Sequence, residues 1–175
     1  MKRTALRYGL YSAIILTGLM SLSLFLSPRL GLNYDDREVV GYLSIFLSMI
    51  FIFLGIRYYR NQNNGYLSFG QGLKLGVLMA LLPAVLFGLF NMIYGLVNPH
   101  FFQDYANYYI EDMRRTMPAK EFEVEKAAFL KKMDFLRPPL MQFLVMAITV
   151  FVIGFIVAII SSLALQRKPQ VNVAM

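Results

Sequence analysis

Four stretches of the chain contain no Asp, Glu, Lys or Arg, and each is long enough to cross a bilayer. They cover residues 8–28, 39–56, 75–99 and 138–166. A membrane-spanning helix needs about 20 mostly apolar residues, and these runs are too long and unbroken for the strands of a barrel. The pattern therefore predicts an all-α membrane protein with four transmembrane helices. Their expected ranges are 4–27, 39–59, 69–97 and 139–165.

Local signals suggest where these helices begin and end. Pro28 is expected to end the first helix, because proline cannot donate the next backbone hydrogen bond. Residues 29–38 would then form a short loop. Ser68 and Gln71 match a capping box, which places the start of the third helix at Phe69.

The polar segment between the third and fourth runs, residues 98–137, has a helical periodicity of its own. Aromatic residues and methionines recur every three or four positions on both sides of Pro118, with charged residues between them. This predicts two amphipathic helices, which either lie on the outer membrane surface or fold back over the end of the bundle. We expect one domain, 1–168, with this segment as an outer cap, and a loose tail over 169–175. Candidates for contact with a partner are the aromatic residues of the cap: Phe102, Tyr105, Tyr109, Phe122 and Phe129.

Charge is divided between the two sides of the predicted membrane. All ten acidic residues fall in 29–38 and 98–137, whereas the other three polar segments carry only basic residues. Because Lys and Arg collect at the cytoplasm-facing ends of spanning helices, we expect both termini to be cytoplasmic and the cap to lie outside. The same rule accounts for the net charge of +7 without a nucleic-acid partner.

The third predicted helix carries a small residue at every fourth position. A spacing of four places these residues on one helix face, where small side chains let two helices approach closely. We interpret the stripe as a packing face inside the bundle; the alternative is a homodimer seam or a groove for a lipid or ligand. Pro83, in the same helix, predicts a kink. The stripe consists of Gly72, Gly76, Ala80, Ala84 and Gly88.

Two large amides, Asn91 and Gln142, lie in the outer halves of the third and fourth predicted spans. A hydrogen bond between them would satisfy both side chains in lipid, and we predict that bond. The alternative role is contact with a substrate. A cavity bordered by these amides and Tyr94 would indicate a transporter, a channel or a lipid-handling protein.

Few residues of the chain point to catalysis. It has no cysteine and a single histidine, His100, and its predicted spans have no central charged residue of the kind that ion-coupled transporters need. It also lacks a nucleophile elbow and a phosphate-binding glycine loop. We therefore expect a protein that is not an enzyme and holds no cofactor or metal. The leading hypothesis is an accessory or scaffold protein that binds a protein partner or lipid; the alternative is a small oligomeric transporter, channel or lipid-handling protein.

Two segments at the ends of the third predicted helix carry a family resemblance. They are Gly65–Gly76, with the sequence GYLSFGQGLKLG, and Ile93–Pro99, with Ile93-Tyr94 followed by Val97-Asn98-Pro99. The chain resembles the DUF4199 family of uncharacterised four-helix membrane proteins from Bacteroidota. The resemblance implies a location in a bacterial inner membrane and implies no reaction. Genes of such proteins look like neighbours of membrane-associated glycosyltransferases, so a glycosyltransferase partner is a further alternative.

Overall fold

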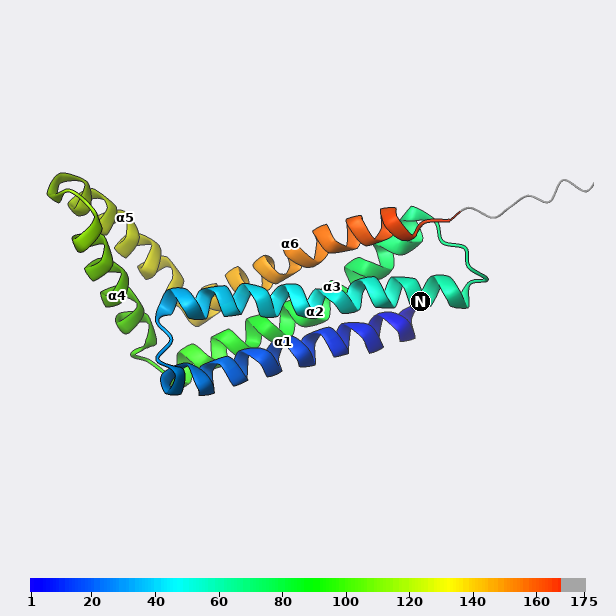
Figure 1. Ribbon diagram of the computed structural model, residues 1–175, viewed down its shortest axis with the longest axis horizontal. Coiled ribbons are helices and arrows are strands. Elements are labelled where there is room, and N and C mark those ends of the chain that lie inside the picture. Colours follow the sequence, from blue (N-terminus) through cyan, green and yellow to red (C-terminus); the bar gives the residue numbers. More distant parts are fainter. Residues whose placement is uncertain (168–175) are drawn as a thin grey trace, which may run out of the picture.

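A computed structural model describes residues 1–167 as six α-helices (Figure 1). Their bounds are α1 Lys2–Leu30, α2 Tyr34–Gln62, α3 Phe69–Val97, α4 Phe101–Thr116, α5 Ala119–Leu136 and α6 Pro139–Leu165. The predicted all-α class, with two helices between the third and fourth long ones, is confirmed. The predicted tail, 169–175, lies outside the described residues.

Four of these helices are long and apolar enough to cross a membrane. Helices α1, α2 and α3 have 29 residues each, and α6 has 27. At a rise of 1.5 Å per residue they are about 40–44 Å long, which exceeds the roughly 30 Å of a bilayer's hydrocarbon core. The four long apolar helices indicate a multi-pass membrane protein.

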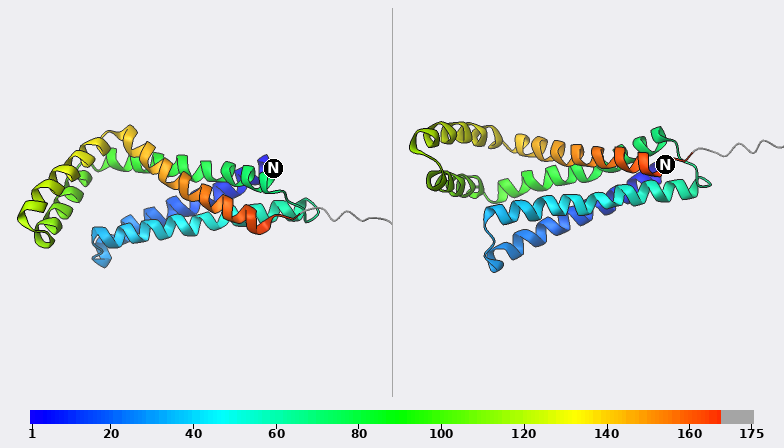
Figure 2. Two further views of the ribbon diagram at one scale, coloured as in Figure 1. Left: turned by 90° about the horizontal axis from the view of Figure 1, so that it is seen from above. Right: turned by 45° about the horizontal axis from the view of Figure 1, so that its top comes forward.

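Helices α1, α2, α3 and α6 lie side by side in a bundle, and α4 and α5 form a hairpin beyond one end (Figures 1 and 2). Helix α3 contacts both α1 and α6, and α2 contacts the same two helices. The hairpin is inclined to the bundle axis (Figure 1). Both ends of the described chain lie at the opposite end, where the backbones of Leu67 and Arg167 exchange hydrogen bonds of 3.0 and 2.8 Å.

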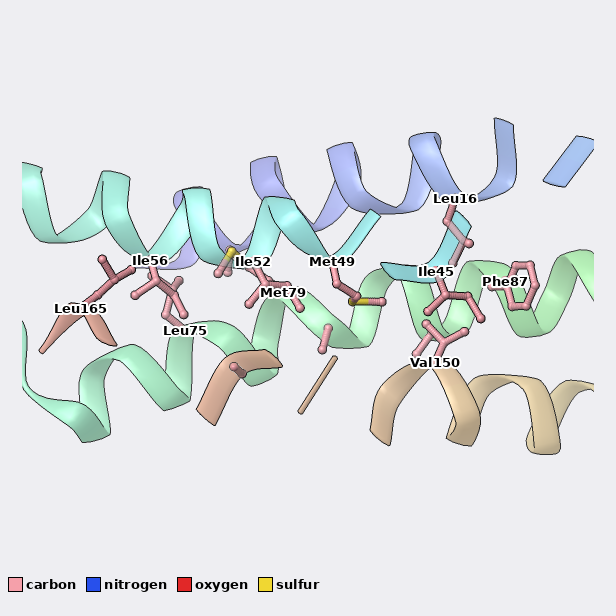
Figure 3. Packing of buried hydrophobic residues seen from close by; sticks show 14 of the residues in the cluster. Leu16, Ile45, Met49, Ile52, Ile56, Leu75, Met79, Phe87, Val150 and Leu165 are labelled. Atoms are coloured by element: carbon pink, nitrogen blue, oxygen red, sulfur yellow. The ribbon is translucent and has the colours of Figure 1, made fainter. Parts of the chain in front are cut away.

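The centre of the bundle is filled by aliphatic and methionine side chains (Figure 3). The core includes side chains that are completely buried: Leu16 of α1, Ile52 and Ile56 of α2, Leu75 and Met79 of α3, and Val150 of α6. The outer surface of the bundle is also apolar. Examples that are more than half exposed are Ile14, Phe46, Ile93 and Ile148. Long helices that are apolar on all sides are typical of membrane spans.

The small-residue stripe of α3 packs against α6 of the same chain. A Cβ added to Gly76 would lie 2.5 Å from the Cβ of Ala158. A Cβ added to Gly154 of α6 would lie 2.8 Å from that of Ala80. Both distances are shorter than atoms tolerate, so the close approach of α3 and α6 depends on glycine at these positions. The stripe residues are all buried: Gly72, Gly76, Ala80, Ala84 and Gly88.

Helix α1 continues past the proline that was expected to end it. It includes Pro28 and runs to Leu30, so the predicted end at residue 27 was wrong. The missing amide of Pro28 costs one helical hydrogen bond, and the loss of a single bond near a helix end does not stop the helix. Termination occurs at Gly31, whose φ of 65° is a left-handed conformation that favours glycine.

Helix α2 begins five residues earlier than predicted, at Tyr34. The cause is a capping box that the prediction overlooked. The amide of Asp36 donates to Oδ1 of Asn33 at 2.8 Å, and the amide of Asn33 donates to Oδ2 of Asp36 at 3.3 Å. Asp35 and Asp36 of the expected loop 29–38 therefore lie in the first turn of a helix, where the helix dipole favours negative charge.

The ends of α3 and α6 lie where the sequence predicted them. The capping box of α3 is present, because the amide of Gln71 donates to Oγ of Ser68 at 3.3 Å and the amide of Ser68 donates to Oε1 of Gln71 at 3.1 Å. Pro83 lies inside α3, and the kink there stays a prediction.

Candidate functional site

The hairpin is attached to the bundle by hydrogen bonds between two tyrosines of α4 and two carboxylates of α2. The hydroxyl of Tyr108 donates to Oδ2 of Asp35 at 2.9 Å. The hydroxyl of Tyr109 donates to Oδ1 of Asp35 at 2.8 Å and to Oε2 of Glu38 at 3.3 Å. We call these four residues the latch. One carboxylate thus accepts bonds from two neighbouring side chains that lie more than 70 residues away in the sequence.

The early start of α2 is what makes the latch possible. The capping box of Asn33 and Asp36 places Asp35 in the first turn of a helix rather than in a loop. Asp35 and Glu38 are three residues apart, so they lie on one face of that helix. That face is the one toward which Tyr108 and Tyr109 point their hydroxyls.

A cluster of aromatic rings continues the attachment beside the latch. Tyr34 is at its centre, with its ring centroid 5.5 Å from that of Tyr105 and 5.1 Å from that of Tyr108. The guanidinium of Arg37 lies 5.2 Å from the same ring. Phe101, at the start of α4, lies 5.2 Å from Tyr94 of α3. Ring contacts at these distances are each worth about 0.5–1.5 kcal/mol, so the cluster joins α2, α3 and α4.

The aromatic residues expected to contact a partner make contacts within the hairpin and the bundle, and their contact with a partner stays a prediction. Phe122 is only 7% exposed and lies beneath the cationic groups of Arg114 and Lys126. Phe129 of α5 stacks 6.5 Å from Tyr105 and 6.0 Å from Tyr109. Phe102 is half-buried beside Phe101. These side chains are largely occupied within the chain.

Both tyrosines of the latch retain their protons at neutral pH. Burial and the hydrogen bond to Asp35 raise the pKa of Tyr109 above the usual value of 10.0. The hydrogen bond to Asp35 is the main cause of a raised pKa at Tyr108, and burial contributes less. A phenol that donates to a carboxylate loses that bond on ionisation, and the two negative charges would then repel. Both hydroxyls therefore remain donors.

The predicted hydrogen bond between Asn91 and Gln142 is not formed. Asn91 donates from Nδ2 to the carbonyl of Phe87 in its own helix at 3.0 Å. Gln142 donates from Nε2 to the carbonyl of Arg137 at 2.9 Å. The prediction failed because each side-chain NH2 group donates to a backbone carbonyl four or five residues earlier. Such a local bond costs less conformational entropy than a bond between two helices.

Gln142 nevertheless contacts α3 at a position that the sequence did not single out. The amide group of Gln142 occupies the space where a side chain on Gly95 would lie. Tyr94, the third residue of the proposed ligand site, contacts Phe101 of α4. Asn91, Tyr94 and Gln142 therefore each contact a different partner, and no hydrogen bond joins the two amides.

A shallow, open hollow lies on α4, beside the latch. Its lining residues are Tyr108, Glu111, Asp112 and Arg115. They recur at three- and four-residue spacing and so share one helix face. Glu111 and Arg115 form an ion pair, and Tyr108 belongs to both the hollow and the latch. The hollow offers charged groups of both signs beside an aromatic ring, which suits a polar protein surface.

The sequence held no pairing signal for the latch. Asp35 and Glu38 looked like the ordinary charge of a loop, and Tyr108 interrupted the regular aromatic spacing of the cap. Within residues 1–167, no group of three or more His, Cys, Asp or Glu side chains is placed to hold a metal ion. The arrangement places hydrogen-bonding and charged groups at the junction of the hairpin and the bundle.

Comparison with known proteins places the chain in a family without a described activity. The family model described as "Protein of unknown function (DUF4199)" matches residues 7–167. No curated protein and no solved structure matches the chain. The resemblance noted at the ends of α3 is therefore confirmed at the level of the family.

Proposed function

We propose that this chain, which belongs to the DUF4199 family, is a non-catalytic accessory membrane protein whose hairpin binds a protein partner. The observation that carries the proposal is the latch. A loop that serves only to connect α3 and α6 needs no such attachment. Here two tyrosines and an aromatic cluster hold the hairpin to the first turn of α2, which is how a recognition element is held in a defined position.

The distribution of charge supports an orientation with the hairpin outside and both termini in the cytoplasm. The segments at the other end of the bundle carry basic residues and no acidic ones, in agreement with the rule that Lys and Arg collect on the cytoplasmic side. A bacterial inner membrane, and a glycosyltransferase as the partner, rest on the family resemblance alone.

The face of α4 that carries the hollow is the surface that we assign to the partner. The hollow formed by Tyr108, Glu111, Asp112 and Arg115 lies on the hairpin and combines both charges with an aromatic ring. Aromatic and arginine side chains are common centres of protein interfaces. Because Tyr108 also donates to Asp35, a partner seated in the hollow would contact the latch directly.

The alternative role as a transporter, channel or lipid-handling protein has less support. It requires a polar site inside the bundle, and the candidates for that site were Asn91, Tyr94 and Gln142. Both amides donate to backbone carbonyls of their own segments, which leaves those donors occupied. The stripe on α3, the other candidate ligand surface, is filled by α6.

Affinity purification from native membranes tests the proposal. The full chain should retain one partner in stoichiometric amount, and reversal of Glu111 and Asp112 to lysine should abolish that association. The matched control reverses Glu123 and Glu125, two exposed carboxylates of α5, and should keep the partner. If the unmodified chain retains no stoichiometric partner, or both double variants retain it equally, the proposed function is wrong.

A further inference from the structure

Helix α5 has one buried face and one unusually exposed apolar face. Phe122 and Met133 are only 7% and 8% exposed, whereas Val124 and Phe135 are 68% and 59% exposed. Together with Ala128 and Lys131, the two exposed residues follow the spacing of a single helix face, at positions 124, 128, 131 and 135. We call these four residues the free face of α5. Nothing in residues 1–167 covers its two large apolar side chains.

The free face of α5 is turned away from α4. Helix α4 packs on the opposite face of α5, through Phe122 and Phe129. In Figure 1, α5 is the hairpin helix on the side of α6, and α4 is the one on the side of α3. Under the proposed orientation, the outer leaflet beside α6 is the membrane surface nearest to α5.

Positive charge predominates in the part of α5 that leads into the membrane domain. Residues 126–137 contain Lys126, Lys131, Lys132 and Arg137 against Asp134 alone, a net charge of four minus one, or +3. Under the proposed orientation these basic residues border the outer end of a spanning helix, where the topology rule does not favour them. They therefore need another explanation, such as an anionic partner.

A further exposed apolar residue lies just beyond the end of α5. Leu140, in the first turn of α6, is 60% exposed and lies five residues beyond Phe135. Apolar side chains on a helix with lysines alongside match the pattern of helices that lie in the interface of a bilayer, with the apolar face in the headgroup region.

We propose that the free face of α5 docks on the outer leaflet, with the phosphate groups of anionic lipids bound by Lys131 and Lys132. Val124 and Phe135 then enter the headgroup region, and the hairpin is supported on the membrane surface. This surface lies on α5, whereas the hollow assigned to the protein partner lies on α4, so either assignment can fail without the other.

Spin labelling of the full chain tests this docking, because the protein has no native cysteine. A nitroxide is placed on Ala128→Cys, and a control nitroxide on the exposed Glu123→Cys, away from the free face. Each protein is reconstituted in bilayer discs of phosphatidylcholine with or without phosphatidylglycerol. Collision rates with oxygen, which partitions into lipid, and with a water-soluble nickel complex report the surroundings of each label.

The expected result is a higher oxygen-to-nickel ratio at position 128 in discs that contain phosphatidylglycerol, with the label at 123 remaining exposed to water. Replacing Lys131 and Lys132 by glutamine should lower the ratio of docked to free hairpin by roughly thirtyfold, about fivefold for each charge removed. Replacing them by arginine should preserve docking. High salt should weaken it, because screening shortens the reach of the charges.

Two results would overturn the proposal. One is an oxygen-to-nickel ratio at position 128 that does not depend on phosphatidylglycerol or on the two lysines. The other is shielding of that label from both reagents that increases with the number of protein copies per disc, which would show that a second copy of the chain covers the free face.

Discussion

The latch makes a quantitative prediction about the position of the hairpin. Replacing Asp35 by alanine removes the acceptor of both tyrosine hydroxyls and leaves Tyr109 only its longer bond to Glu38, at 3.3 Å. A hydrogen bond to a carboxylate is worth about 1.5–3 kcal/mol when shielded. The bond from Tyr109 to Asp35 is partly exposed to solvent, so we assign it about 1 kcal/mol. The ratio of attached to detached hairpin should therefore fall roughly fivefold.

Distances between two spin labels measure this change directly. Labels on Leu30→Cys, at the end of α1, and Lys120→Cys, at the tip of the hairpin, should give one narrow distance distribution in the otherwise unmodified chain. Asp35→Ala should broaden it and add a longer component. Tyr109→Phe in the Asp35→Ala background should add little, because the shorter bond of Tyr109 is already lost and only its 3.3 Å bond to Glu38 remains.

The control for charge is Asp134→Ala, which removes a carboxylate from α5 and should leave the distribution unchanged. If Asp35→Ala gives the same narrow distribution as the unmodified chain, the bonds to Asp35 do not hold the hairpin in position. The same conclusion follows if Asp134→Ala broadens the distribution as much as Asp35→Ala, since the effect would then come from net charge.

Three further predictions concern packing, the amides and pH. Gly76→Ala should lower the free energy of unfolding of the purified protein by about 1–3 kcal/mol through overpacking against α6. The control is Gly70→Ala, where an added Cβ meets nothing within 4 Å; it should leave the thermal unfolding temperature nearly unchanged or slightly higher. Asn91→Leu and Gln142→Leu should destabilise additively, within about 0.5 kcal/mol; a larger coupling energy in denaturant unfolding would indicate that the amides interact. The raised pKa of Tyr109 means that its contribution to stability is complete below the usual tyrosine pKa of 10.0 and is lost only as the pH rises through the higher folded value. The difference in tyrosinate absorbance between the unmodified chain and Tyr109→Phe should therefore appear above pH 10.0, and a difference that appears below it would contradict the raised pKa.

The membrane helices were predicted well wherever local chemistry decides their ends. Helix α3 begins after the capping residue Ser68, and α6 begins at Pro139; both signals lie within a few residues of the boundary. The turn between α1 and α2 was misjudged because the expectation treated Pro28 and the acidic residues after it as loop signals. The capping pair of Asn33 and Asp36 outweighed them.

The junction between the hairpin and the bundle was beyond sequence reasoning. The bond between Tyr109 and Asp35 joins residues that are 74 positions apart, and periodicity carries no information about such pairs. The aromatic spacing of the cap correctly predicted two helices, but it could not show that Tyr105 and Phe129 face each other rather than a partner. Which of these side chains lie on the surface depends on how the helices are arranged in space. The residue pattern along one chain does not specify that arrangement.

We propose that a four-helix membrane domain presents the hairpin on the outer side of the membrane. Single cysteines at Lys120, on the hairpin, and at Gln62, at the other end of the bundle, test it in cells whose inner membrane is intact. A membrane-impermeant maleimide should label Lys120→Cys at once and Gln62→Cys only after lysis. Labelling of Gln62→Cys in intact cells, with Lys120→Cys protected until lysis, would contradict the account.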